Sequence, residues 1–167
     1  ELNSNFITGY QDGKISWQVN ANYIWTGRNR YLYKANKIES GLIMNKKGRV
    51  IIDHIQARNI KVNTRTKTFR TSGGLNAIFN REIEKENGEK SIKPISITAN
   101  ELQYYQLSNR TVINKNIMLK QDDVEIKPVG AVVVDHDEDL VKILDTSEEC
   151  FLLLNSFEKD SVKSIRI

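Results

Sequence analysis

The sequence feature that most constrains the fold of this 167-residue chain is an alternation of apolar and polar residues with a period of two. Its clearest example is residues 15–23, with the sequence ISWQVNANY. Successive side chains of an extended strand point to opposite faces, so such a run buries one face and leaves the other in water. Shorter runs of this kind occur at residues 31–33, 42–44, 50–52, 60–62, 75–79, 102–104, 117–119 and 124–126.

Residues that favour tight turns separate these runs. They lie at residues 12–13, 45–48, 63–65, 72–74, 87–88, 108–109, 121–123 and 135–137. Asn and Gly accept the positive φ of tight hairpins, and Asn and Asp side chains can bond to their own backbone. Short alternating strands joined by frequent turns predict an antiparallel all-β sandwich, barrel or β-roll. The chain length suits one such domain over residues 1–167.

Two stretches depart from the alternation. Residues 80–90 are rich in Glu and Lys and are interrupted by Asn87-Gly88, so we predict a long exposed hairpin connection between Phe79 and Ile92. Residues 147–157 fit either a short helix or a closing strand, and the sequence does not choose between the two.

Composition excludes several classes of protein. With 39% hydrophobic and 28% charged residues, the chain can form a packed core. The longest apolar runs are four residues at 131–134 and five at 150–154, so no membrane-spanning helix is expected within the sequence. Cys150 is the single cysteine, which excludes an internal disulfide or a thiolate metal cluster. Because the sequence starts at Glu1 rather than Met, we expect that a signal peptide or membrane anchor upstream has been removed.

Charge is divided unevenly along the chain, whose formal net charge is +4. Residues 1–90 hold 16 Lys and Arg against 8 Asp and Glu, a balance of +8, and residues 91–167 hold 9 against 13, a balance of −4. This division suits head-to-tail contacts or an anionic ligand near one end. When charge is considered alone, the better explanation is a β-sheet surface whose charged residues only face water. Nucleic acid is not expected as a partner, because no basic run is longer than two residues.

No set of catalytic or metal-binding residues is found. His54 and His136 are far apart in the sequence and have no third ligand at a recognised spacing, which argues against a metal site. Residues 135–139 form an acidic turn without the ligand order of an EF-hand. Nucleotide-binding loops and nucleophile elbows are absent from the sequence. We therefore expect no enzymatic activity and no cofactor.

A six-residue pattern, aliphatic-x-Ala-x-x-aliphatic, recurs at residues 19–24, 55–60, 97–102 and 129–134. Its alanines are 36, 42 and 32 residues apart. A period of this length predicts repeated strand pairs, each of which needs its neighbours to bury its apolar face. The alanine has a physical use, because a small side chain allows close approach where a strand bends or crosses the facing sheet.

The segments that carry this repeat resemble a known family. The sequence FITGYQDGKISWQVNA at residues 6–21 resembles the Gly-x-x-x-Trp-x-φ-x-Ala opening of the C component of the lipopolysaccharide transport (Lpt) system, where φ is an aliphatic residue. Residues 55–75 and 97–104 resemble the φ-x-Ala-x-x-φ-x-Tyr repeats of the wider OstA-like superfamily, which includes the A component. The resemblance covers most of residues 6–145.

The resemblance implies an open, twisted antiparallel β-jellyroll that shields the acyl chains of lipopolysaccharide and performs no chemistry. In that family the C component is anchored in the inner membrane, receives lipid from an ABC transporter and passes it to the periplasmic A component through an edge-to-edge β-bridge. The implied partners are therefore lipopolysaccharide, an A-like periplasmic protein and the membrane subunits of the transporter, and the implied location is the periplasm at the inner membrane. The missing anchor leaves the A-like and C-like assignments open, and the Gly–Trp opening favours the C-like one.

A lipid groove must be apolar and continuous, because each CH₂ exposed to water costs about 0.8 kcal/mol. The candidates are residues predicted to face inward: Trp17, Val19, Ile24, Leu32, Ile38, Ile43, Ile51, Ile55, Ile60, Val62, Phe69, Ile78, Ile97, Leu102, Tyr104, Ile113, Ile117, Leu119, Val124 and Ile126. The residues alone favour a filled core, whereas the resemblance implies a trough that the protein's own side chains leave unfilled. Lys46, Lys47 and Arg49 are candidate contacts for lipid phosphates, and a plain basic hairpin tip is the alternative.

Unpaired edge strands can pair with another chain, and we expect them at residues 6–10 and 132–144. An edge-to-edge homo-oligomer would use the same edges. Two other functions stay open. One is a polysaccharide-binding protein that uses Trp25, Tyr31, Tyr33, Tyr104 and Tyr105, and the other is a self-assembling structural β-protein without lipid cargo.

Overall fold

The computed structural model describes residues 5–128, 130–138, 140–144 and 149–153, which form one antiparallel sheet of thirteen strands. This confirms the predicted all-β class. The strands are β1 (Asn5–Gln11), β2 (Lys14–Thr26), β3 (Leu32–Met44), β4 (Val50–Asn63), β5 (Thr68–Glu84), β6 (Lys90–Ala99), β7 (Glu101–Tyr105), β8 (Arg110–Asn114), β9 (Met118–Gln121), β10 (Val124–Ile126), β11 (Val132–Asp135), β12 (Leu140–Leu144) and β13 (Glu149–Leu153). Among the described residues, no helix is long and apolar enough to span a membrane.

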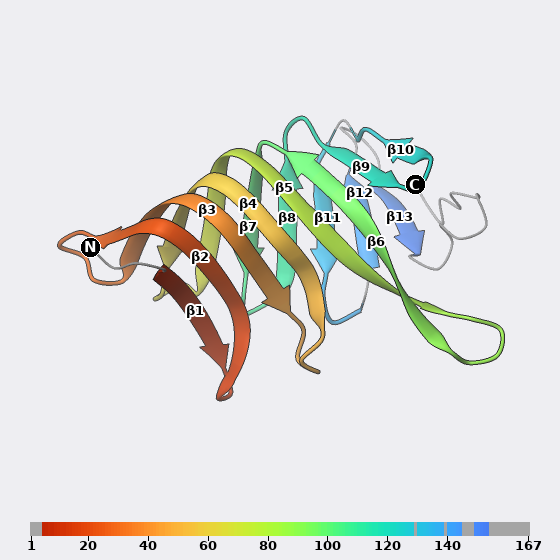
Figure 1. Cartoon of the computed structure of the whole chain (residues 1–167), viewed down its shortest axis with the longest axis horizontal. Coiled ribbons are helices and arrows are strands. Elements are labelled where there is room, and N and C mark those ends of the chain that lie inside the picture. The colour runs from red at the N-terminus through yellow and green to blue at the C-terminus, as the bar shows by residue number, and fades with distance from the viewer. Residues whose placement is uncertain (1–4, 129, 139, 145–148, 154–167) are drawn as a thin grey trace.

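The four strands β2 to β5 are 13 to 17 residues long and arch across the molecule (Figure 1). Each bends near its middle, where the backbone departs from regular pairing. The β2–β3 ladder shifts between Asn20 and Ala21, and Lys37 in β3 and His54 in β4 have φ values of 53° and 51°. In β5, Gly73 and Gly74 have φ values of 83° and 100°. Left-handed φ values inside a strand are typical of bulges, which bend it and increase its twist.

These bends divide the sheet into two walls. The first wall consists of β1, β6, β9, β10 and residues 14–20, 40–44, 50–55 and 75–84 of the arched strands. The second wall consists of β7, β8, β11, β12, β13 and residues 22–26, 32–36, 59–63 and 68–72. Because β5 pairs with β7 along its first half and with β6 along its second half, the two walls are joined along the line of bends.

Three of the four alanines of the sequence repeat lie on this line of bends. Ala21 and Ala57 adjoin register shifts, and Ala99 is the last residue of β6. Ala21 and Ala99 are buried. Larger side chains at these positions would push the converging walls apart, which accounts for the small residue in the repeat.

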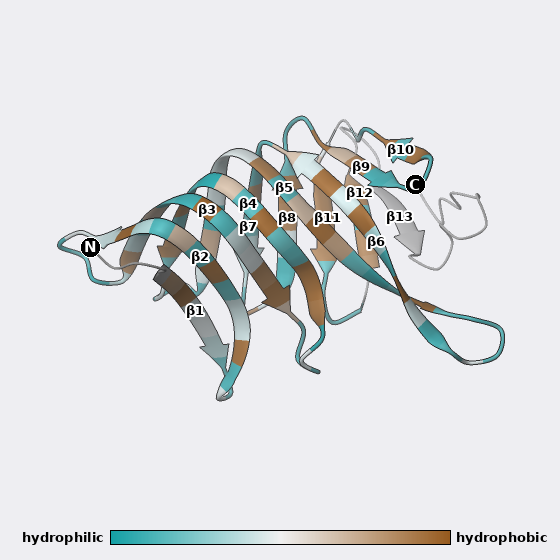
Figure 2. Ribbon diagram, in the orientation of Figure 1, coloured by the Kyte–Doolittle hydropathy of each residue, from teal (hydrophilic) through white to brown (hydrophobic). Residues whose placement is uncertain are grey.

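Alternation along the strands places the core between the walls. In β5, Phe69, Leu75 and Phe79 are buried, while their neighbours Arg70 and Asn76 are exposed. Figure 2 shows the same change between hydrophobic and hydrophilic residues along the arched strands. The core is therefore shared by strands that are distant in the sequence.

The predicted hairpin connection over residues 80–90 is wrong in extent. The strands β5 and β6 continue as a paired ladder out to Glu84 and Lys90, and only residues 85–89 form the turn. The strand continues because Arg81 and Ile83 keep the inward alternation and are fully buried. The many charged residues of this stretch had suggested a loop, but they occupy the outer face and the turn.

One of the two predicted sheet edges is confirmed. The strand β1 ends one side of the sheet, as expected for residues 6–10. The second prediction is wrong, because β13 pairs with β12 and covers the edge expected at residues 132–144. The closing strand β13 also resolves the choice left open for residues 147–157 in favour of a strand, although residues 147–148 and 154–157 lie outside the described part of the chain.

Candidate functional site

Most of the predicted groove residues converge between the two walls and are at most 5% exposed. These are Trp17, Val19, Ile38, Ile43, Ile51, Ile55, Ile60, Val62, Phe69, Ile97, Leu102, Tyr104, Ile113, Ile117 and Leu119. Ile24 and Ile126 are partly buried and pack against this cluster. Val124 is half-buried on β10.

Two predicted groove residues lie elsewhere. Ile78 is on the outer face of the first wall, opposite Asp53 in the ladder, because Ala77 and Phe79 take the inward positions on either side of it. Leu32 is 37% exposed at the end of the second wall that is distant from the line of bends. The predicted inward position of Ile78 is wrong. The run at residues 75–79 ends in two consecutive large apolar residues, so the sequence does not show which of them faces the core.

The space between the walls is filled by the side chains of the described residues. A cavity lined by Phe79, Ile95, Ile97 and Leu119 and by three valines of β11 and β12 measures about 10 Å³, room for about one water molecule. The expected unfilled trough is therefore wrong. Exposed apolar surface is unfavourable in water, so side chains that no ligand covers close on one another.

The outer face of the second wall is hollowed at its free end. An open cavity of about 250 Å³ is lined there by Leu32, Lys61 and Arg70, among other residues. These side chains have the opposite strand parity to Val62 and Phe69, which face the core. The cavity therefore lies on the outer face of the sheet and not between the walls.

A stack of four rings connects the two walls. The ring centroids of Trp17 in the first wall and Phe69 in the second are 5.0 Å apart. Tyr104 follows at 5.2 Å from Phe69, and His136 lies edge-on at 5.8 Å from Tyr104. The walls therefore touch through their largest side chains, and any ligand between them must displace this contact.

Side-chain hydrogen bonds close the walls at the strand ends farthest from the line of bends. Trp17 Nε1 donates to Gln106 Oε1 at 3.1 Å, and Gln106 Nε2 donates to the carbonyl of Tyr10 at 3.0 Å. The hydroxyls of Ser16 and Tyr104 are 3.0 Å apart. We call this set (Tyr10, Ser16, Trp17, Tyr104 and Gln106) the seam. At the seam the walls are held together by side chains, whereas along the line of bends the backbone is continuous.

The surroundings of the seam are polar and ionic. The Tyr104 hydroxyl donates to Asn109 Oδ1 at 3.2 Å, and burial raises the pKa of Tyr104, so the hydroxyl stays protonated. Asn109 Nδ2 donates to Asp137 at 2.8 Å, and Lys46 lies 3.6 Å from the same carboxylate. These contacts extend the closure from β7 to the β3–β4 and β11–β12 turns.

The three candidate phosphate contacts share the β3–β4 turn but differ in their surroundings. Lys46 faces Asp137 across the seam, and Lys47 is exposed. Arg49 donates to the carbonyl of Asn80 at 2.8 Å and lies 3.3 Å from Glu82, so it stabilises the first wall. Lys90 on the other side of Glu82, at 2.9 Å, lowers the pKa of that carboxyl.

The two histidines are not brought together. His136 is fully buried and its Nε2 lies 2.6 Å from the hydroxyl of Thr111. Burial lowers the pKa of His136 to about 4, against the opposing effect of Asp135 and Asp137. His54 is exposed and contacts Asp53 at 2.7 Å. In the described part of the chain, no group of three or more His, Cys, Asp or Glu side chains is placed to hold a metal ion.

Sequence reasoning missed Arg81, a charged residue inside the sheet. It is fully buried between the walls, and its Nη1 donates to Gln121 Oε1 at 2.7 Å. Its position was detectable, because Arg81 has the same strand parity as Phe79 and Ile83. This pair places a charged group in the apolar interior.

The aromatic residues suggested for polysaccharide binding do not form one surface. Tyr104 is fully buried in the core, and Tyr33 is partly buried and packs against it. Trp25 and Tyr105 are exposed, and Tyr31 stacks under the guanidinium of Arg65 at 4.1 Å. The set is therefore split between the interior and the surface.

Comparison with known proteins gives a match at the level of fold. No family model matches the chain, and no curated protein matches it. Among solved structures, the chain is similar to LptH of Pseudomonas aeruginosa, described as the LptA-homologous periplasmic component of the lipopolysaccharide transport device. The TM-score is 0.55 at 9% sequence identity, over 78% of this chain and 83% of LptH. This likeness confirms the expected fold, an open and twisted antiparallel sheet.

Proposed function

We propose that this chain is a non-enzymatic carrier in lipopolysaccharide export, which shields acyl chains between its two walls. The observation that carries the proposal is an apolar interior, shared by both walls of an LptH-like sheet, that is closed on one side only by side chains. A chain of about twelve carbons removed from water gains roughly 10 kcal/mol. An apolar interior of this kind supplies that environment without any catalytic group.

Lipid entry requires the walls to part at the seam. Each side-chain hydrogen bond of the seam contributes about 1 kcal/mol net, so opening there costs far less than breaking the backbone ladders along the line of bends. Acyl chains then replace the contacts that the side chains of the two walls make with each other.

The location and partners follow from the same proposal. The protein would act in the periplasm, receiving lipid from an inner-membrane ABC transporter and passing it to an A-like protein through the edge of β1. The GKISWQVNA opening at residues 13–21 supports a C-like member with a membrane anchor. Fractionation of cells that make the full-length protein tests this point. A C-like member stays with the inner membrane, and an A-like member is released with the periplasm.

Photocrosslinking tests the carrier function directly. A photoreactive phenylalanine analogue replaces Phe69, which faces the interior, and in a control variant it replaces Ile92, which is 51% exposed. Incubation with lipopolysaccharide and irradiation should give a lipid adduct at Phe69 and none at Ile92. If the folded protein gives no adduct at Phe69 or at Ile60, the chain does not carry lipid between its walls.

A further inference from the structure

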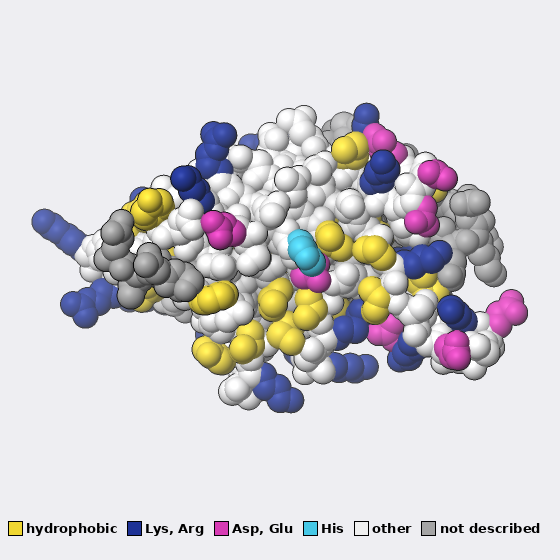
Figure 3. Space-filling model, in the orientation of Figure 1, with side chains coloured by type: hydrophobic (Ala, Val, Ile, Leu, Met, Phe, Trp, Pro, Cys, Tyr) yellow, Lys and Arg dark blue, Asp and Glu magenta, His cyan; other side chains and the backbone are white. Residues whose placement is uncertain are grey.

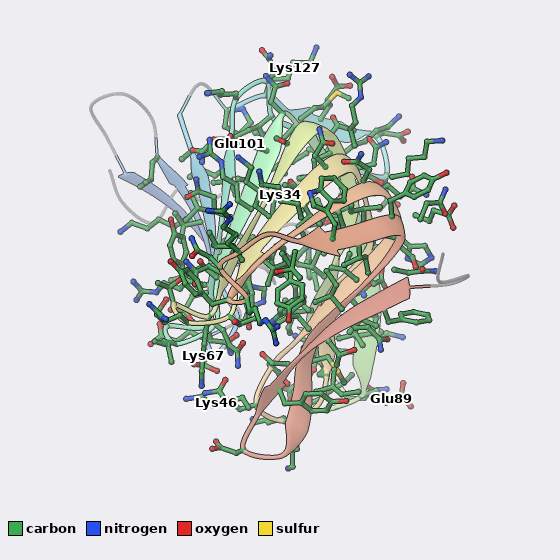
Figure 4. The ribbon with its side chains drawn as sticks, turned by 90° about the vertical axis from the view of Figure 1, so that its left-hand side faces the viewer. Lys34, Lys46, Lys67, Glu89, Glu101 and Lys127 are labelled. Carbon is green, nitrogen blue, oxygen red and sulfur yellow. The ribbon has the colours of Figure 1, made fainter. Side chains whose placement is uncertain are left out.

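The second wall has a strongly basic outer surface. Residues 23–38 and 56–74 contain nine Lys and Arg and no Asp or Glu. They include the second-wall parts of β2 to β5 and the turns that join β2 to β3 and β4 to β5. Figure 3 shows Lys and Arg side chains projecting at the left end of the molecule, where the β2–β3 turn lies in Figure 1. Figure 4 views that end and labels Lys34 and Lys67.

Three of these cations form one row across neighbouring strands. Lys34 is directly opposite Lys61 in the β3–β4 ladder, and Lys61 is directly opposite Arg70 in the β4–β5 ladder. Like charges directly opposite each other destabilise a sheet. Glu101 offsets the charge of Arg70 at 2.7 Å, but among the described residues neither lysine forms an ion pair. The row of Lys34, Lys61 and Arg70, which we call the basic row, therefore costs the isolated protein stability.

An exposed tryptophan extends the basic row. Trp25 is directly opposite Lys34 in the β2–β3 ladder and is 44% exposed. Tyr23, two residues earlier, is 53% exposed. Among the residues that the structure describes, the pairing of β1 ends at Ala21 of β2, so Trp25 lies at an edge of the second wall. Trp and Tyr favour the headgroup level of a membrane, and neighbouring Lys and Arg favour anionic lipids.

We propose that Trp25 and the basic row dock this protein on the surface of a bilayer that contains anionic lipids. Lipid phosphates would relieve the repulsion between Lys34 and Lys61, and the indole of Trp25 would lie among the headgroups. The phosphates of a nucleic acid would also neutralise these cations, but they would not explain the exposed indole of Trp25 beside the basic row. The surface faces away from the interior, so the proposal goes beyond lipid transport and does not depend on it.

Vesicle binding by the purified chain tests the proposal. The probes are vesicles of phosphatidylcholine with phosphatidylglycerol and vesicles of phosphatidylcholine alone, neither of which contains lipopolysaccharide. The double variant Lys34→Gln/Lys61→Gln should bind the anionic vesicles about 30-fold more weakly, since each lysine near such a surface contributes about 1 kcal/mol. Its urea midpoint should equal or exceed that of the wild type, because the substitutions remove a repulsion. Loss of binding would then not reflect unfolding.

A matched variant, Lys14→Gln/Lys120→Gln, makes the same charge change at exposed lysines of β2 and β9 in the first wall. It should keep vesicle affinity within about twofold of the wild type, because these charges lie away from the docking face. Equal losses in the two double variants would show attraction by net charge alone and overturn the proposal. Equal binding to neutral vesicles would also overturn it.

Tryptophan fluorescence separates a bilayer from other polyanions. Trp25 and Trp17 are the two tryptophans, and Trp17 is already buried at 5% exposure. Anionic vesicles should shift the emission of the wild type to shorter wavelength and leave that of Trp25→Phe unchanged. Binding to duplex DNA as tight as that to vesicles, without an emission shift on vesicles, would assign the surface to nucleic acid and overturn the proposal. Loss of lipid adducts at Phe69 would leave these results unchanged.

Discussion

At the scale of single residues, Gly9 and Trp17 set how closely β1 approaches the core. The indole of Trp17 lies over Gly9, and a Cβ added at Gly9 would be 1.9 Å from Trp17 Nε1. Trp17 in turn contacts Phe69 and donates to Gln106. A side chain at Gly9 would therefore disturb the ring stack and the seam together.

We expect Gly9→Ala to lower the free energy of unfolding by about 2 kcal/mol, the usual cost of overpacking. Urea unfolding followed by tryptophan fluorescence measures the change. Gly27→Ala is the control, because a Cβ at Gly27 meets nothing within 4 Å. An equal loss in both variants would mean that contact with Trp17 is not the cause.

His136 makes stability depend on pH. Its pKa of about 4 in the folded protein lies below the value of 6.5 expected in the unfolded chain, because burial disfavours the charged form. Between these pH values the unfolded chain binds more protons, so stability rises with pH and is lost as the pH falls from 6.5 to 4. The loss amounts to about 3 kcal/mol.

His136→Gln should reduce that dependence, because Gln does not titrate and still offers a hydrogen bond to Thr111. The measurement is the free energy of unfolding in urea at pH 7 and at pH 4 for the wild type and the variant. The difference between the two pH values should be about 3 kcal/mol smaller in the variant. Parallel pH dependences would exclude His136 as the source.

At the scale of elements, the bends of β2 to β5 decide the architecture. Without them the long strands would form a flat sheet with one face open, and the apolar residues of the two walls would not meet. In β5 the bend depends on Gly73 and Gly74, both of which have positive φ. Thr71 and Leu75, on either side of the bend, have the same strand parity and are both buried, so the inward face of β5 continues through the bend.

Substitutions at the two glycines should lower the free energy of unfolding by different amounts. Gly74→Ala should cost about 1 kcal/mol for the positive φ alone, since a Cβ there meets nothing within 4 Å. Gly73→Ala should cost about 3 kcal/mol, because its Cβ would also lie 2.8 Å from Cβ of Arg58. Urea midpoints of the two variants test this order. Equal midpoints would mean that β4 and β5 have room to separate at the bend.

At the scale of the whole molecule, the two walls are joined in a different way on each of their two sides. Backbone ladders run through the line of bends, whereas the seam relies on side chains such as Gln106, which bonds to both Trp17 and Tyr10. Local opening is therefore expected at the seam before the ladders break. This asymmetry gives the fold a side through which a ligand can enter.

We expect Gln106→Ala to weaken the seam and to lower the free energy of unfolding by about 2 kcal/mol, since it leaves the buried Trp17 Nε1 without its acceptor. Hydrogen exchange should accelerate in β1 more than in β4. Gln56→Ala, at an exposed position near the line of bends, is the control and should leave both strands unchanged. Acceleration of β1 and β4 to the same extent in Gln106→Ala would contradict opening at the seam.

Local sequence patterns predicted the strands well where alternation was regular, as at residues 15–23, and they predicted the first edge at β1. They failed where many charged residues suggested a loop although the alternation of a strand continued. Arg81 and Ile83 continue β5 in this way, and both are buried between the walls. The groove residues were mostly placed on the correct face. Ile78 was not, because Ile78 and Phe79 are both apolar and their sequence does not show which of the two faces the core.

The sequence by itself determined that this chain forms antiparallel strands with one apolar face, because the direction of each side chain in a strand depends on its immediate neighbours alone. Only the tertiary structure decided that the interior is filled and that the seam closes it. Those features depend on contacts between residues far apart in the chain, such as Ser16 and Tyr104, which are separated by 88 positions. Distances between such residues follow from how the bends bring the walls together, and no local pattern encodes them.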